Sequence, residues 1–116
     1  MKKLLIILSC VFLSFSDDSD VVYKVTWYGS EFHGRKTASG EIFNKNKYTC
    51  AATTKYRLGD RLELTNVKNG NSVVVKVNDR GNFERHGIHL DLSEGAFKQL
   101  APIKRGVISV TIKKLN

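Results

Sequence analysis

Residues 72–81 read Ser72-Val73-Val74-Val75-Lys76-Val77-Asn78-Asp79-Arg80-Gly81. The run of valines predicts a buried strand, and the four residues that end it are typical of a turn. A carboxylate placed where a rigid strand meets a loop is well held, so Asp79 is a candidate catalytic residue. Asn, Asp and Gly also occur in turns for backbone reasons alone, so a purely structural interpretation of Asp79 stays open.

The segment before this strand predicts its hairpin partner. Residues 61–65 alternate polar and apolar side chains with a period of two, and Asn69-Gly70 follows as a turn signal. We therefore expect residues 61–65 and 72–77 to pair, with a connection slightly longer than the tightest hairpin turn.

Three further strands are predicted on either side of this hairpin, at residues 21–28, 88–92 and 107–115. Ser93 suits the start of a short helix that ends near Leu100, before Pro102. Residues 29–40 are polar and contain glycines, which predicts a long loop with a function. The pattern is mainly all-β with one short helix and no alternation of strands and helices, so a small closed barrel fits.

Length, composition and charge exclude several classes of protein. The chain has 116 residues, 41% hydrophobic and 26% charged, as is usual for one globular domain. No apolar run reaches the roughly 20 residues of a membrane-spanning helix. The formal charge of +8 is spread along the chain, which argues weakly for nucleic acid and is compatible with the polyanionic bacterial cell wall.

The first residues predict export. A basic start, an apolar stretch and small residues near Ser16 are typical of a signal peptide covering residues 1–16, which leaves residues 17–116 as the domain. Lipidation at Cys10 is the alternative, and only then do we expect membrane attachment. We therefore expect the protein in the periplasm or cell envelope. With residues 1–16 removed, Cys50 is the remaining cysteine, so no intrachain disulfide is expected there.

Other candidate residues are weaker on their own. Glu41 lies in the long loop, where a solvated carboxylate is the simplest interpretation. Asp91 lies between Leu90 and Leu92; if the leucines point inward, Asp91 and His89 point to the other face, where a structural hydrogen-bond acceptor is the more common role. The histidines lack helical ligand spacing, so we expect no metal site and no cofactor.

These pieces together resemble the RlpA (rare lipoprotein A) family, whose domain is a six-stranded double-psi β-barrel. The matches are collinear over residues 25–115 and comprise Trp27-Tyr28-Gly29, Phe32-His33-Gly34, Thr37-Ala38-Ser39-Gly40-Glu41, Phe43, Leu58-Gly59, Val67, Asn69-Gly70, Ser72-Val73-Val74-Val75, Val77-Asn78-Asp79-Arg80-Gly81, Phe83 and Leu90-Asp91-Leu92-Ser93.

The resemblance implies an endolytic lytic transglycosylase. Such an enzyme cleaves peptidoglycan strands that lack stem peptides and leaves 1,6-anhydro-muramic acid ends. It places the catalytic acid at Asp79 and a second carboxylate at Glu41, which we expect to raise the pKa of Asp79. We expect the substrate to contact Trp27, Tyr28, His33 and Arg80, although a structural role for Arg80 is an equal alternative. We expect a monomer and no nucleic-acid partner.

One departure from the family keeps a second function open. Ala52 stands where the family has a histidine close to its acids. A barrel without this histidine could bind cell-wall glycan without cleaving it, as an expansin-like binding module does.

Overall fold

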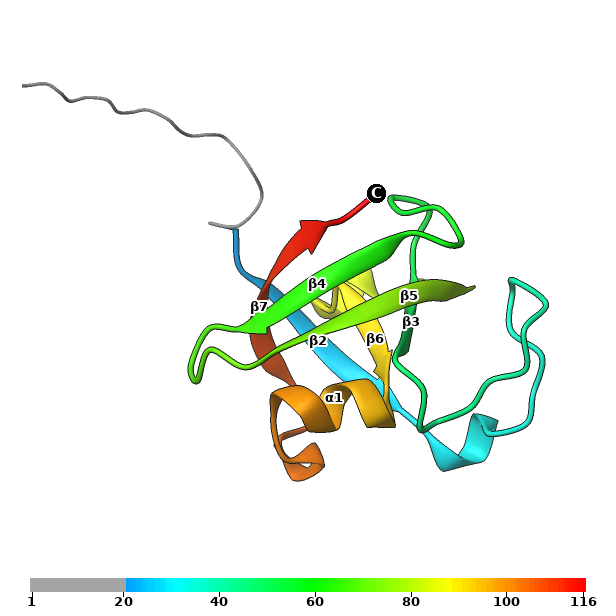
Figure 1. Ribbon diagram of the computed structural model, residues 1–116, viewed down its shortest axis with the longest axis horizontal. Coiled ribbons are helices and arrows are strands. Elements are labelled where there is room, and N and C mark those ends of the chain that lie inside the picture. Colours follow the sequence, from blue (N-terminus) through cyan, green and yellow to red (C-terminus); the bar gives the residue numbers. More distant parts are fainter. Residues whose placement is uncertain (1–20) are drawn as a thin grey trace, which may run out of the picture.

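The computed structural model describes residues 21–116, and Figure 1 shows their arrangement. The predicted signal peptide and Cys10 lie outside the described residues. The strands are β2 (Tyr23–Tyr28), β3 (Thr49–Ala52), β4 (Arg61–Asn66), β5 (Ser72–Arg80), β6 (Leu90–Ser93) and β7 (Ile108–Lys114). One α-helix, α1 (Glu94–Leu100), and three short 3-10 turns, η3 (Ser30–Phe32), η4 (Glu84–His86) and η5 (Ile103–Arg105), complete them.

The strands of the described region close into a barrel in the order β2-β6-β3-β5-β4-β7. Strands β2 and β6 are parallel, as are β3 and β5, and the other neighbours are antiparallel. Closure leaves no unpaired strand edge. The expected six-stranded double-psi barrel with one short helix is confirmed, and α1 lies across one end of it in Figure 1.

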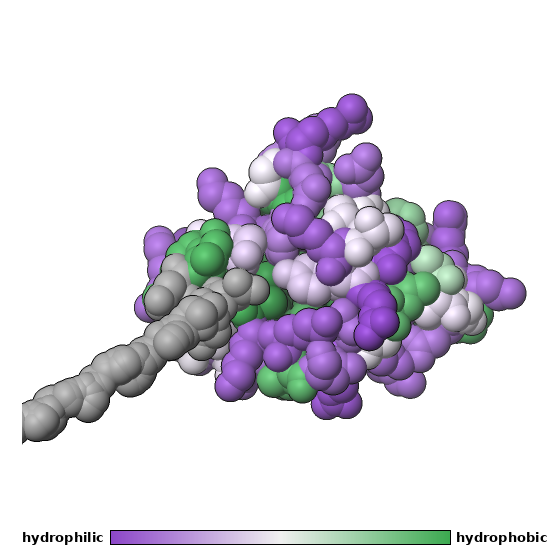
Figure 2. Space-filling view, turned by 90° about the horizontal axis from the view of Figure 1, so that it is seen from above, coloured by the Kyte–Doolittle hydropathy of each residue, from purple (hydrophilic) through white to green (hydrophobic). Residues whose placement is uncertain are grey.

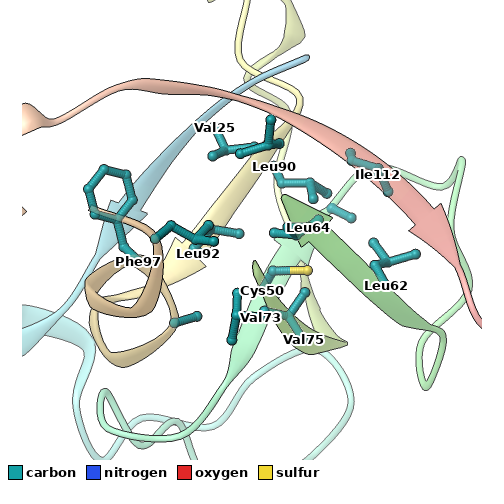
Figure 3. Close-up of a cluster of buried hydrophobic side chains, with 14 of the residues drawn as sticks. Val25, Cys50, Leu62, Leu64, Val73, Val75, Leu90, Leu92, Phe97 and Ile112 are labelled. Atoms are coloured by element: carbon teal, nitrogen blue, oxygen red, sulfur yellow. The ribbon is translucent and has the colours of Figure 1, made fainter. Parts of the chain in front are cut away.

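The core forms because alternate residues of each strand point into the barrel. Leucines of β4 and β6 meet valines of β5 there, and Phe97 of α1 covers one end, as Figure 3 shows. Helix α1 begins at Ser93, whose hydroxyl accepts a hydrogen bond from the backbone N–H of Ala96. The expected helix start at Ser93 is thus confirmed.

Strands β4 and β5 form the predicted hairpin, and the structure places Thr65 opposite Ser72. Strand β3, in contrast, was not predicted from the sequence. All four of its residues are buried, so the segment has no polar–apolar alternation to indicate a strand.

Strand β5 contains a bulge where it passes β3. Val77 lies opposite Cys50, but the next pair is Asp79 with Ala51, so Asn78 is the extra residue. The bulge turns Asp79 out of the barrel, whereas strict alternation after the inward-pointing Val77 would turn it inward.

Most of the surface in the view of Figure 2 is hydrophilic, with small separate hydrophobic areas. Within residues 21–116, no helix is long and apolar enough to cross a membrane.

Replacement of a core leucine should destabilise the barrel strongly. Leu64 is 0% exposed, so we expect Leu64→Ala to lower the free energy of unfolding by about 2–5 kcal/mol, because it removes buried surface and leaves a cavity. Urea denaturation followed by circular dichroism measures this change. The matched control is Leu115→Ala, since Leu115 is 45% exposed and its loss should cost little. Equal effects of the two variants would contradict the described core.

Candidate active site

A row of four residues crosses the barrel surface, one from each of four neighbouring strands. Asp79 of β5 pairs with Ala51 of β3, Ala51 pairs with Asp91 of β6, and Asp91 pairs with Thr26 of β2. Residues paired across strands share a face of the sheet. Since Cys50, Leu90 and Leu92 point into the core, the row lies on the outer face, as expected for Asp91.

Asp79 is held by hydrogen-bond donors. Its Oδ1 accepts the backbone N–H groups of Ala38, at 3.0 Å, and Arg80, at 2.9 Å. The hydroxyl of Tyr28 donates to Oδ2 across 3.5 Å. The loop that precedes Glu41 therefore closes onto the end of β5 through Asp79.

Asp91 has a different environment. Burial, followed by the charges of Asp79 and Glu31, raises the pKa of Asp91 to about 6. Its Oδ1 is buried and has no hydrogen-bond partner within the described part of the chain. A carboxyl group in these surroundings favours its neutral, protonated form. The sequence offered no signal for this, because the charges that act on Asp91 come from β5 and η3.

Tyr28 interacts with both acids, through a hydrogen bond to Asp79 and electrostatically with Asp91. Its ring stacks on Phe43 with centroids 4.6 Å apart and meets the edge of Phe32 at 5.6 Å. Burial raises the pKa of Tyr28 well above its usual range, and the charges of Asp79 and Asp91 raise it further. Tyr28 therefore stays protonated, and its hydroxyl donates to Asp79.

Glu41 lies on another side of Asn78. Its carboxylate forms an ion pair with Lys76, with Nζ and Oε2 2.5 Å apart, and Oε1 accepts from the Asn78 side-chain amide at 3.1 Å. These hydrogen bonds, that of Lys76 first, lower the pKa of Glu41. Glu41 is thus charged at neutral pH, and within residues 21–116 no hydrogen bond or ion pair joins it to Asp79.

A groove with a volume of about 720 Å³ opens beside Glu41, within the usual range of ligand-binding pockets. Its walls combine amides, two lysines, one carboxylate and an exposed aromatic ring: Glu41, Ile42, Asn44, Asn46, Lys47, Tyr48, Thr49, Lys76 and Asn78. Because two lysines and one glutamate line it, the groove has an excess of positive charge.

The structure places the other predicted contact residues differently. Alternation along β2 turns Trp27 to the opposite face from Tyr28, its indole N–H donates to the carbonyl of Ile103 at 2.9 Å, and its ring packs on the core. His33 is exposed, and its Nδ1 accepts from the backbone N–H of Lys45 at 3.2 Å. It lies in the same loop as Phe32, the ring that meets Tyr28.

Arg80 ties β5 to the end of β3. Its Nη1 donates to the carbonyls of Ala52, at 3.4 Å, and Thr53, at 3.2 Å. These contacts favour the structural alternative for Arg80. Ala52 itself is 0% exposed and belongs to the core cluster, so a side chain at this position points into the barrel.

Within residues 21–116, no three His, Cys, Asp or Glu side chains gather as metal ligands would. Cys50 is buried, and burial raises the pKa of its thiol well above the usual range, so it does not supply a nucleophile.

A closed six-stranded barrel with two parallel strand pairs, carrying carboxyl groups on one outer face, is a double-psi β-barrel with a candidate active site. The sequence model of the lytic transglycolase family matches residues 21–112. The chain belongs to this family, and within it to the RlpA proteins.

The RlpA relatives are much longer than this chain. The chain is 52% identical over 91 residues to the RlpA protein of Aquifex aeolicus, which covers 78% of this chain and 39% of that protein. It is 41% identical over 90 residues to the endolytic peptidoglycan transglycosylase RlpA of Neisseria meningitidis, covering 78% and 37%. The chain thus spans about two fifths of the length of these relatives.

Solved structures share the barrel. An expansin of Clavibacter michiganensis superposes with a TM-score of 0.64 and 26% identity, over 82% of this chain and 50% of the expansin. A variant of that expansin was solved in complex with cellohexaose, with a TM-score of 0.62 and 25% identity, over the same shares of the two chains. A Streptomyces papain inhibitor superposes with a TM-score of 0.60 and 26% identity, over 77% and 89%.

The environment of Asp91 predicts a specific pH dependence of stability. A carboxyl whose pKa rises on folding, here from 3.8 to about 6, disfavours the folded state once it ionises. Wild type should therefore lose stability as pH rises from about 4 to above 6, and Asp91→Asn should not show this loss. Urea denaturation at pH 4 and pH 8 measures the free energy of unfolding of both proteins. Relative to wild type, the variant should be more stable at pH 8 than at pH 4. A difference between the two proteins that does not change with pH would contradict the description of Asp91.

Proposed function

We propose that this domain is a lytic transglycosylase domain that cleaves peptidoglycan glycan strands between N-acetylmuramic acid and N-acetylglucosamine. The observation that carries the proposal is the pair of carboxyl groups, Asp79 and Asp91, on either side of Ala51 on the outer face of the barrel. Membership of the family supports the reaction class. Strands without stem peptides are the proposed substrate, and 1,6-anhydro-muramic acid the product end.

The reaction needs few groups from the protein. A carboxyl protonates the glycosidic oxygen, the sugar's own 6-hydroxyl attacks the anomeric carbon, and the hydroxyl proton returns to the protein. No carboxylate nucleophile and no water take part, unlike in the two-carboxylate hydrolases. A negative charge beside the anomeric carbon stabilises the oxocarbenium-like transition state. We place Asp79 at this reacting centre, and Glu41 lines the adjoining groove.

The groove suits a glycan strand. Tyr48, 45% exposed, offers an aromatic face for a sugar ring, and the amides of Asn44 and Asn46 can bond to hydroxyl and N-acetyl groups. Lys47 can attract the lactyl carboxylate of muramic acid, a role for which Arg80 is less available because it bonds to two carbonyls. The expansin solved with cellohexaose supports a glycan as ligand of this fold.

A substrate in the cell wall requires export. We propose that residues 1–16 are a signal peptide and that residues 17–116 form the mature domain, which is a monomer. Cys10 is the alternative site of lipid attachment. Intact-mass analysis of native protein separates the routes: simple secretion gives a chain that starts at Asp17, and lipidation gives a diacylated chain that starts at Cys10.

A binding module is the second candidate function. Ala52 in place of the family histidine favours it, as does the similarity to an expansin. Such a protein would bind glycan strands and never cut them.

Replacement of Asp79 tests the main proposal. Wild type incubated with purified stem-peptide-free glycan should yield anhydro-ended products, detected by mass spectrometry. Asp79→Asn keeps the shape of the side chain but removes its charge, so product formation should fall about 100-fold or more. The control is Glu63→Gln on β4, outside the groove lining, which should cut normally. A wild type that binds glycan without cutting it would replace the enzyme by the binding module.

Replacement of Tyr48 tests the groove. Loss of a stacking ring should weaken glycan binding about tenfold, equivalent to about 1.4 kcal/mol. Calorimetric titration of Tyr48→Ala with glycan, in the Asp79→Asn background so that the ligand survives, measures it. Val107→Ala is the control, because Val107 is similarly exposed, at 46%, and does not line the groove. Unchanged affinity of the Tyr48 variant would place the glycan elsewhere.

A further inference from the structure

We propose that Asp91 carries the proton for glycan cleavage and that Asp79 acts beside it as a charged partner. This inference rests on the proposed function and assigns its two proton steps to a particular residue. It departs from the role that the sequence alone gave to Asp79.

The register brings the two side chains to one surface. Both flank Ala51, and neighbouring strands lie about 4.8 Å apart, so their Cα atoms are about 10 Å apart across β3. The side chain between them is the single methyl group of Ala51, which is 5% exposed, and the hydroxyl of Tyr28 reaches Asp79 across the same face. A glycosidic bond bound at this face would have one acid on each side.

Hydrogen bonding distinguishes the two acids. Asp79 accepts from two backbone N–H groups and faces the hydroxyl of Tyr28, an arrangement that suits a carboxylate. Asp91 has a buried Oδ1 without a partner in the described region, which suits a neutral carboxyl. Asp79 is thus suited to carry a negative charge, and Asp91 is suited to carry a proton.

Burial and two nearby carboxylates, Asp79 and Glu31, oppose the ionisation of Asp91. The nearby carboxylates raise its pKa, and the phenol and thiol beside it remain neutral. His89 immediately precedes β6, and its ring stacks on Tyr23 with centroids 4.0 Å apart. Titratable groups of neighbouring elements that interact electrostatically with Asp91 are Asp79 on β5, Glu31 on η3, Tyr28 on β2 and, from inside the barrel, Cys50 on β3.

The step balances with the substrate and this one acid. The Asp91 proton moves to the glycosidic oxygen as the bond from that oxygen to the anomeric carbon of muramic acid breaks. The oxygen of the sugar's 6-hydroxyl bonds to the anomeric carbon, and its proton moves to the Asp91 carboxylate. Asp91 ends protonated, as it began, and neither water nor a further reactant is consumed.

A titration that does not depend on activity tests the assignment. Carboxyl carbon shifts followed by NMR in the whole protein should show Asp91 titrating near pH 6. Asp79→Asn removes a neighbouring charge and should move this titration to lower pH, whereas Glu63→Gln should leave it in place. An Asp91 that titrates near pH 4, or a midpoint unmoved by Asp79→Asn, would overturn the assignment.

Cleavage assays complete the test. Asp91→Asn should lose about 100-fold or more of the anhydro-product rate while still binding glycan. Wild-type activity should fall as pH rises above about 6, as the acid loses its proton. A folded Asp91→Asn protein that cuts within about threefold of wild type would overturn the proposal, and if this variant fails to fold, the wild-type titration still decides. A wild type that cuts no glycan at any pH would overturn the proposed function instead.

Discussion

One extra residue in β5 sets the geometry of the whole site. Because Asn78 is inserted opposite the Cys50–Ala51 step, Asp79 faces outward beside Ala51 instead of inward behind Val77. Asn78 is itself 3% exposed and donates to Glu41. The bulge therefore fixes Asp79 on one side and the Glu41 loop on the other. A β5 without the bulge would have the same apolar core and would turn Asp79 away from Asp91.

A single serine connects the site loop to the barrel. The hydroxyl of Ser93 donates to the carbonyl of Lys47 at 2.5 Å and accepts from the backbone of Thr49, at 3.2 Å, and of Ala96. Next to it, Gly95 lies against the backbone of Asn46, where a Cβ would come within 2.7 Å of the carbonyl oxygen. The segment that lines the groove is thus held to the start of α1, and the site is built on packed elements.

Much of the fold could be predicted from local patterns, since the β4–β5 hairpin and the helix start at Ser93 depend on alternation and capping. Strand β3 could not be predicted, because a strand with neighbours on both sides and no exposed residue has no alternation. Asp79 stands out in the sequence at a strand end. The role of Asp91 does not, because Asp79 and Glu31 come from other elements and approach it only when the barrel closes. Which face of β2 Trp27 lies on could not be predicted from the sequence, because it depends on the register with β6 and β7.

Cys50 lies in the middle strand of this arrangement, between the strands that carry the two acids, and is 0% exposed with a thiol that burial keeps protonated. A thiol reagent can reach it only when the barrel core opens, as it would if β3 separated from β5 or β6. The rate of its modification is therefore a measure of how often the floor of the site opens. The native Cys50 thiol can therefore report local opening of the barrel in the strand that lies between the two acids.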